Sequence, residues 1–227
     1  MLDWEFIYAN IPLYQQALRL TVRLACFGIL GAFVLGFLIS LIKFYRIPIL
    51  SQLCQIYIEL SRNTPLLIQL YFLYFGLPKI GLVLSSELCA VVGLTFLGGS
   101  YMAESFRSGF EAVSKRQYEV GLSLGLTPVQ NVFYVIFPQA LAVALPSLAA
   151  NVIFLIKETS VFSIVALADL MYVAKDLIGL YYETDEALLM LVLAYLIVLL
   201  PISLLARLVE GRLRHAGFRP SSAFSGE

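Results

Sequence analysis

Two pairs of ionisable residues lie next to long apolar runs, where charged side chains are rare. Glu104 and Arg107 are three residues apart, so on a helix they share one face. Lys157 and Glu158 follow the longest uncharged run, residues 120–156. Ionisable side chains at membrane depth are costly and are therefore candidates for function. Glu104 and Arg107 either fix a helix end as an interfacial ion pair or take part in gating.

Several polar side chains could together complement a small solute that carries both a positive and a negative charge. Lys157 beside Glu158 offers the two opposite charges, with hydroxyls and amides nearby. Alternatively, residues 157–160 form an outer-face turn in which Thr159 or Ser160 caps the next short helix. The candidate residues for a substrate pathway are Gln69, Tyr101, Glu104, Asn151, Lys157, Glu158, Thr159 and Ser160.

The sequence lacks the residue combinations that are typical of catalysis or metal binding. His215 is the only histidine, and it lies in a basic tail without a convincing partner. Cys26, Cys54 and Cys89 are far apart in apolar segments, a pattern that indicates buried hydrophobes. A Gly-x-x-x-x-Gly-Lys-Ser/Thr loop for ATP is also missing. We therefore predict that the chain is not an enzyme and binds no metal or cofactor.

The composition indicates what kind of protein positions these residues. The chain has 227 residues, of which 60% are hydrophobic and 13% charged, and its mean hydropathy is +0.89. An average soluble domain is roughly 45–50% apolar and about 25% charged. Basic and acidic residues balance at 15 each, so a basic surface for nucleic acid is not expected. The composition excludes an ordinary cytosolic enzyme and a disordered regulator, and it predicts an all-α integral membrane protein.

A helix that crosses a bilayer needs about 20 mostly apolar residues, and the uncharged runs predict five such spans. Residues 24–42 and 187–206 are the clearest. The uncharged run 120–156 is too long for one straight helix, and it contains three prolines. Because turn residues are missing from its second half, we predict a polar surface segment followed by one proline-bent span. The five predicted spans are 17–43, 62–79, 86–106, 131–156 and 187–207.

Five spans place the two ends of the chain on opposite sides of the membrane. The side richer in Lys and Arg is expected to be cytoplasmic, which puts the N-terminus outside and the C-terminus inside. Residues 1–16 are predicted to form an amphipathic segment on the membrane surface, and residues 208–227 a cytoplasmic tail. Arg62 is expected to extend to the inner headgroups. The whole chain, 1–227, is then a single transmembrane domain.

Residues 111–131, called the coupling loop below, connect the third and fourth predicted spans on the cytoplasmic side. Ser114 and Gln117 match a capping box that starts a helix. Gly125 suits the left-handed position that ends it. Thr127 and Gln130 match a second capping box, with a proline at the first helical position. We predict two short helices joined at a glycine turn.

The coupling loop resembles the cytoplasmic signature of membrane subunits of bacterial ATP-binding-cassette importers. That signature reads E-A-A, three residues, G, nine residues, I-x-L-P, and Glu119, Gly125 and Pro138 stand at its spacing. The positions that differ are Val120, Gly121, Val135 and Phe137. Gly121 replaces an alanine and is expected to loosen the first helix by about 1 kcal/mol.

More narrowly, the chain resembles the polar-amino-acid permease branch of this family, from about residue 21 to residue 210. Asn63 stands where the family usually has Gly, and Ser114 where it has Pro. The matching stretches are Arg62-Asn63-Thr64-Pro65-Leu66-Leu67 with Gln69, Tyr101-Met102-Ala103-Glu104-Ser105-Phe106-Arg107, Ala112-Val113, Lys115, Gln117, Leu124-Gly125-Leu126, Pro138-Gln139-Ala140, Pro146, Asn151 and Lys157-Glu158-Thr159-Ser160.

The resemblance implies the type I importer permease fold and a permease subunit of an ATP-driven importer for polar or charged amino acids, in the bacterial inner or plasma membrane. The coupling loop would dock into a cytoplasmic ATPase subunit, with Glu119 as a polar anchor and Gly125 as the turn. The remaining coupling residues implied are Tyr118, Gly121, Leu122 and Leu126. Alternatively, Glu119 is a solvated charge and Gly125 a routine helix end.

The resemblance also implies the partners. Five helices are too few to enclose a pathway, so a second copy or a related permease is expected to form the other half. Two ATPase subunits, which bind ATP and Mg²⁺, and an extracytoplasmic solute-binding protein complete the expected importer. The rival hypothesis is a secondary transporter or channel for small polar solutes that works without ATP. It predicts inverted repeats, and the sequence shows no internal repeat.

Overall fold

The computed structural model describes residues 2–215, with side chains to Gly211, and these residues form helices and connecting turns without a strand. The predicted all-α architecture is therefore confirmed over the described residues. The elements in chain order are α1 (Trp4–Phe44), α2 (Pro48–Arg62), α3 (Leu66–Tyr71), η1 (Phe72–Gly76), η2 (Leu77–Ile80), α4 (Ser86–Ala112), α5 (Lys115–Ser123), α6 (Pro128–Asn131), η3 (Val132–Ile136), α7 (Phe137–Glu158), η4 (Thr159–Val165), α8 (Leu170–Tyr181) and α9 (Thr184–His215).

Four helical stretches are long and apolar enough to cross a membrane: Trp4–Phe44, Ser86–Ala112, Pro128–Val165 and Thr184–Gly211. The fifth predicted span, 62–79, corresponds to the shorter apolar stretch Leu66–Ile80. This stretch is shorter because the helical backbone is interrupted after α2. The sequence analysis did not assign α2, which starts with a proline in its first turn. The count of five spans and their orientation stay predictions.

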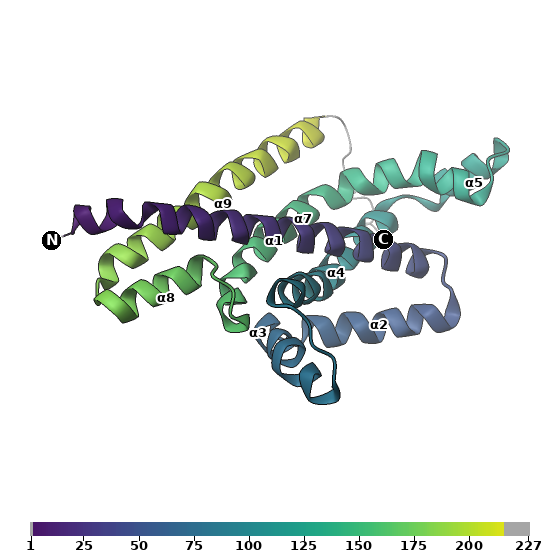
Figure 1. Ribbon diagram of the computed structural model, residues 1–227. Helices are drawn as coiled ribbons and strands as arrows, with labels where there is room; N and C mark the ends of the chain where they lie inside the picture. The colour runs from purple at the N-terminus through teal and green to yellow at the C-terminus, as the bar shows by residue number, and fades with distance from the viewer. Residues whose placement is uncertain (1, 216–227) are drawn as a thin grey trace, which may run out of the picture.

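The N-terminal residues do not form a segment of their own, which corrects the boundary expected at residue 16. Helix α1 runs without interruption from Trp4, where the Asp3 carboxylate accepts from the amides of the first turn. The Tyr14 hydroxyl donates to the carbonyl of Ala187 in α9 at 2.7 Å. This first part of α1 packs against α8 and α9, and these contacts stabilise the helix on the N-terminal side of the apolar span. Figure 1 shows α1 extending along the molecule, with α5 near one end and α8 near the other.

The central core forms where α4 packs between α1 and α7. The helices approach closely because small residues lie at their contacts. A Cβ at Gly36 of α1 would lie 2.7 Å from the backbone nitrogen of Ala103 in α4. A Cβ at Gly109 of α4 would overlap the carbonyl oxygen of Ala140 in α7. Substituents at these two glycines would therefore separate the helices that position the candidate site.

The proline-bent span is observed as one continuous helical stretch, Pro128–Val165, which begins three residues before the predicted span. A π-helical turn, η3, ends two residues before Pro138. The wider turn accommodates the backbone bond that proline cannot make. The polar segment expected before this span corresponds to the coupling loop, whose last four residues form α6 at the start of the helical stretch.

Helix α8 starts at the buried residue Asp169, which lies between the candidate spans. Its carboxylate accepts from the amide of Tyr172 at 3.0 Å and from that of Met171 at 3.4 Å. Burial is the main cause that raises the pKa of Asp169 from 3.8 to about 6, against the lowering effect of these hydrogen bonds. The pKa in the folded chain therefore lies above its unfolded value, and the contribution of this group to stability is lost as the pH rises from about 4 to about 6.

Replacing Asp169 by asparagine is expected to remove this pH dependence while keeping an acceptor for the cap. From about pH 4.5 to about pH 7, the free energy of unfolding of the wild-type chain should fall by roughly 2 kcal/mol relative to that of Asp169→Asn. The measurement is the melting temperature of both proteins in detergent across that pH range. Parallel pH profiles for the two proteins would show that Asp169 does not titrate in the way its burial implies.

Candidate functional site: the coupling loop and a polar pocket

The coupling loop folds into the two helices that were predicted, α5 and α6, joined at a left-handed glycine. Gly125 has φ of 83°, which confirms the turn. The capping box of α6 is confirmed, because Thr127 and Gln130 exchange hydrogen bonds at 3.0 and 3.3 Å. The prediction of a capping box at Ser114 is wrong. Its side chain makes no capping bond, because the amide of Gln117 donates instead to the backbone carbonyl of Ser114 at 3.0 Å.

The outer surface of the loop combines one carboxylate with exposed apolar side chains. Glu119 is exposed, and no ion pair of it occurs among the described residues. Val120, Leu122 and Val129 are also exposed in the loop, and Leu124 at the turn is 78% exposed. The sequence analysis named Leu124 only within the matching stretch Leu124-Gly125-Leu126, and it gave neither Leu124 nor Val129 a role in coupling. The signal for Leu124 was its place directly before the Gly125 turn.

Two of the expected coupling residues face inward. Tyr118 is half-buried, with its ring centroid 6.4 Å from that of Phe44 in α1. Gly121 is buried against Asn131. The reason is the register of α5, a nine-residue helix whose inner face packs on the start of the next helix. Leu126 is half-buried after the turn, so the outer face consists chiefly of Glu119 and its exposed apolar neighbours.

A polar pocket of about 610 Å³ lies between the end of α1, α2 and α4. At its centre, the carboxylate of Glu104 faces three cations, which come from three helices. The nitrogen–oxygen distances are 2.8 Å to Arg107, 3.6 Å to Lys43 and 4.0 Å to Arg62. Arg107 also pairs with Glu111 at 2.7 Å. The pairing of Glu104 with Arg107 on one helix face is confirmed, and the structure adds a cation from each of two further helices.

The position of Arg62 differs from the expectation that it extends to the headgroups. Its guanidinium carbon lies 5.1 Å from the ring centroid of Tyr101, so the side chain turns along the pocket wall toward Glu104. Tyr101 stacks on Phe154 of α7 at 5.0 Å between centroids. Cation–π attraction and the Glu104 charge together favour this inward position. The sequence could not show it, because both partners lie on α4, about 40 residues further along the chain.

The other candidate residues lie on α3, α7 and η4, outside this pocket. Asn151 of α7 donates to the Ser105 hydroxyl at 2.8 Å and to the Tyr101 carbonyl at 3.2 Å, which ties α7 to α4. Gln69 is buried and donates to backbone carbonyls on either side of the break after α2. The polar pocket is lined by Tyr101 and Glu104 but not by Gln69, Asn151 or residues 157–160.

Residues 157–160 lie at the end of α7 and the start of η4. Lys157 is exposed, Glu158 and Ser160 are half-buried, and Thr159 is buried with its hydroxyl donating to the Ile156 carbonyl at 2.7 Å. Neither hydroxyl caps the next α-helix, since Asp169 caps α8. Glu158 follows Asn151 by seven residues, which places both on one face of α7.

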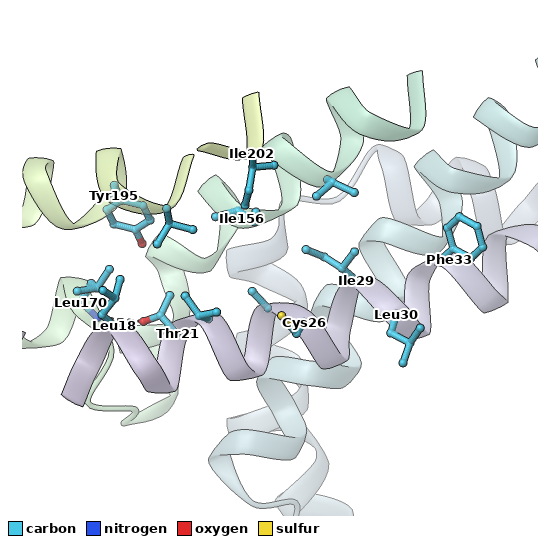
Figure 2. A pocket seen from close by; sticks show the side chains of 14 residues that line it. Leu18, Thr21, Cys26, Ile29, Leu30, Phe33, Ile156, Leu170, Tyr195 and Ile202 are labelled. Carbon is cyan, nitrogen blue, oxygen red and sulfur yellow. Dashed lines mark hydrogen bonds between the residues drawn. The ribbon is translucent and has the colours of Figure 1, made fainter. Parts of the chain in front are cut away.

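An apolar groove of about 390 Å³ runs between α1 on one side and α7 and α9 on the other. Figure 2 shows Leu18, Thr21 and Ile29 of α1 on the side opposite Ile156 and Tyr195. The Thr21 hydroxyl accepts from the amide of Leu170 at 3.3 Å, so it is used within the fold. The groove therefore has an apolar character that suits lipid or helix packing more than a polar solute.

Comparisons with known proteins agree with this architecture. The profile of the family described as "binding-protein-dependent transport system inner membrane component" matches residues 28–215. The probable amino-acid ABC transporter permease protein PatM of Vibrio harveyi is 36% identical over 196 residues, which cover 85% of this chain and 88% of that one. The glutamine transport system permease protein GlnP of Escherichia coli K12 is 31% identical over 214 residues, or 93% of this chain and 98% of that one.

Two solved structures share the fold. A chain from the crystal structure of an amino acid ABC transporter with histidines superposes with a TM-score of 0.84 at 31% identity, covering 93% of this chain and 99% of its own length. A chain of the MetNI methionine ABC transporter in an inward-facing conformation gives a TM-score of 0.71 at 18% identity, covering 88% of this chain and 98% of its own. The second likeness concerns the fold alone.

Proposed function

Because this chain belongs to the family of inner membrane components of binding-protein-dependent transport systems, we propose that it is the permease subunit of an ATP-driven importer for polar or charged amino acids. The family makes it a membrane transport component and not an enzyme. A second permease copy or a related permease forms the other half of the pathway. Two ATPase subunits, which bind ATP and Mg²⁺, and a solute-binding protein complete the complex.

The observation that supports this function most is the exposed tip of the coupling loop. Glu119, Val120, Leu124 and Val129 are all exposed in this loop, a mixture of one charge and apolar side chains typical of a docking surface. Helix α5 lies at one end of the molecule (Figure 1). On closing, the ATPase pushes α5, and the movement reaches the transmembrane helices through the start of Pro128–Val165.

The proposed substrate class rests on the named relatives and on the chemistry of α4 and α7. The relatives are permeases for amino acids and glutamine, and the solved transporter was crystallised with histidines. In this chain, Asn151 and Glu158 follow each other on one face of α7. Both Nδ2 hydrogens of Asn151 are used within the fold, so its amide oxygen and the Glu158 carboxylate offer acceptors to the ammonium group of an amino acid.

The test is reconstitution of the chain with its ATPase and solute-binding protein in proteoliposomes. Uptake of an amino acid that requires ATP and all three components would support the importer. Uptake that persists without ATPase and nucleotide would instead support the secondary transporter or channel. The amino acid that stimulates ATP hydrolysis most identifies the substrate within the class.

Replacing Asn151 or Glu158 by alanine is expected to weaken uptake at low substrate without affecting assembly. Loss of one hydrogen bond to a charged group costs about 1.5–3 kcal/mol, so the KM for uptake should rise roughly 10-fold or more. The matched control is Gln139→Ala on the same helix, which removes a bond to the Val135 carbonyl. Unaltered uptake kinetics in both variants would move the binding site elsewhere.

A further inference from the structure

The side chain of Asn131 holds α5 against the helix that follows it. Asn131 is fully buried, and its Nδ2 donates to the backbone carbonyl of Tyr118 at 2.7 Å. The bond crosses the Gly125 turn and is the one side-chain hydrogen bond between α5 and Pro128–Val165 among the residues that the structure describes. The angle between the two parts of the coupling loop therefore depends on this amide.

The fit of Asn131 requires the glycine at position 121. A Cβ built on Gly121 would overlap the Oδ1 of Asn131 and would lie 2.5 Å from its Cγ. The importer signature has alanine at this position, so this chain departs from it where the asparagine needs space. Gly121 and Asn131 thus form a matched pair, and the helix-loosening glycine has a packing reason.

Stability of the loop does not by itself account for an asparagine here. The Oδ1 of Asn131 is buried and has no hydrogen-bond partner. A buried acceptor without a partner carries a desolvation cost that an apolar side chain of similar shape would avoid. The amide is therefore best explained by the bond that its Nδ2 makes to α5.

Asn131 also stands at the start of the helix that reaches into the membrane. The stretch Pro128–Val165 continues from it through η3 to Asn151 and Glu158, which lie about 30 and about 40 Å further along at 1.5 Å per residue. A side chain that fixes α5 to this end can pass a displacement of the loop to residues of the proposed pathway.

We propose that Asn131 is a positioning residue that links movement of α5 to the helix Pro128–Val165. The proposal rests on the proposed function of the coupling loop. Asn131 is buried, so it does not contact the ATPase; it acts by keeping the loop and the helix in one rigid unit. Removing the hydrogen bond of Asn131 leaves ATPase binding intact but abolishes the transfer of the movement. A substitution of Glu119, by contrast, abolishes both.

The experiment uses the complete complex in proteoliposomes and measures amino acid transported per ATP hydrolysed. Asn131→Asp keeps the shape of the side chain and replaces the donating amide by an oxygen, and Asn131→Ala removes both. Both variants should retain co-purification of the ATPase to within about twofold, while transport per ATP falls at least about tenfold. The double variant G121A/N131A fills the vacated space without restoring the bond and should stay uncoupled.

The control is Ser123→Ala, which removes another side-chain bond to an α5 carbonyl, that of Glu119, on the exposed side. It should leave transport per ATP unchanged. Transport per ATP within about twofold of wild type in Asn131→Asp and Asn131→Ala would overturn the proposal, and so would loss of the ATPase from these variants. If the wild-type chain itself fails to bind an ATPase, the proposed function fails, which is a distinguishable result.

Discussion

Replacing Glu119 by lysine is expected to leave the chain folded and inserted in the membrane, and to remove the ATPase from it. Glu119 is exposed and has no ion pair among the described residues, so the substitution breaks none there. Reversing a charge at a docking surface costs about 2–5 kcal/mol when it meets a complementary group on the partner. The amount of ATPase that co-purifies with the chain should therefore fall by more than about tenfold, since 1.4 kcal/mol corresponds to that factor.

The control for this result is Asp176→Lys, the same reversal at an exposed acidic residue of α8. Helix α8 and the coupling loop lie toward opposite ends of the molecule (Figure 1), so the control should bind the ATPase normally. Monodisperse elution and an unchanged melting temperature of Glu119→Lys would establish that its fold is intact. Normal assembly and normal uptake in Glu119→Lys would count against the docking role and against the importer assignment.

Replacing Glu104 by glutamine is expected to destabilise the packing of α1, α2 and α4. The amide keeps the shape of the side chain, but it leaves Lys43, Arg62 and Arg107 facing one another without the central negative charge. Breaking a fully buried ion pair costs about 3–5 kcal/mol, and a surface pair about 0–1. Because the Glu104 side chain is 23% exposed, we expect an intermediate loss of about 1–3 kcal/mol.

The measurement is the melting temperature of Glu104→Gln in detergent at low and high salt. Repulsion among three cations is screened by salt, so the loss should shrink as the ionic strength rises. The matched control is Glu87→Gln, which breaks the ion pair with Arg23, whose two side chains are 52% and 54% exposed. Similar shifts in both variants would mean that the Glu104 charge has no special role in holding the three helices.

The features that could be predicted from the sequence are those that neighbouring residues specify together. Thr127, Pro128 and Gln130 start a helix through their own side chains, and Gly125 ends one because it alone tolerates φ of 83° without strain. Ser114 shows the limit of this reasoning. It begins the helix as expected, yet its hydroxyl is not used, because the carbonyl of the same residue competes for the amide of Gln117.

The features that were missed depend on residues far apart in the chain. Tyr118 turns inward because Phe44 of α1 lies beside it, and Arg62 turns inward because Tyr101 and Glu104 of α4 lie opposite. The first residues of α1 stay helical because they pack on α8 and α9. Hydrophobic periodicity along one segment contains no information about such partners.

Hydropathy and capping act over a few residues, so they were enough to predict a helical membrane protein and the turn of its coupling loop. The packed helices were needed to show which residues of the loop are exposed, that Glu104 gathers cations from three helices, and that Asn131 fills the space left at Gly121. The physical reason is that these contacts form between segments that meet only after the helices have packed.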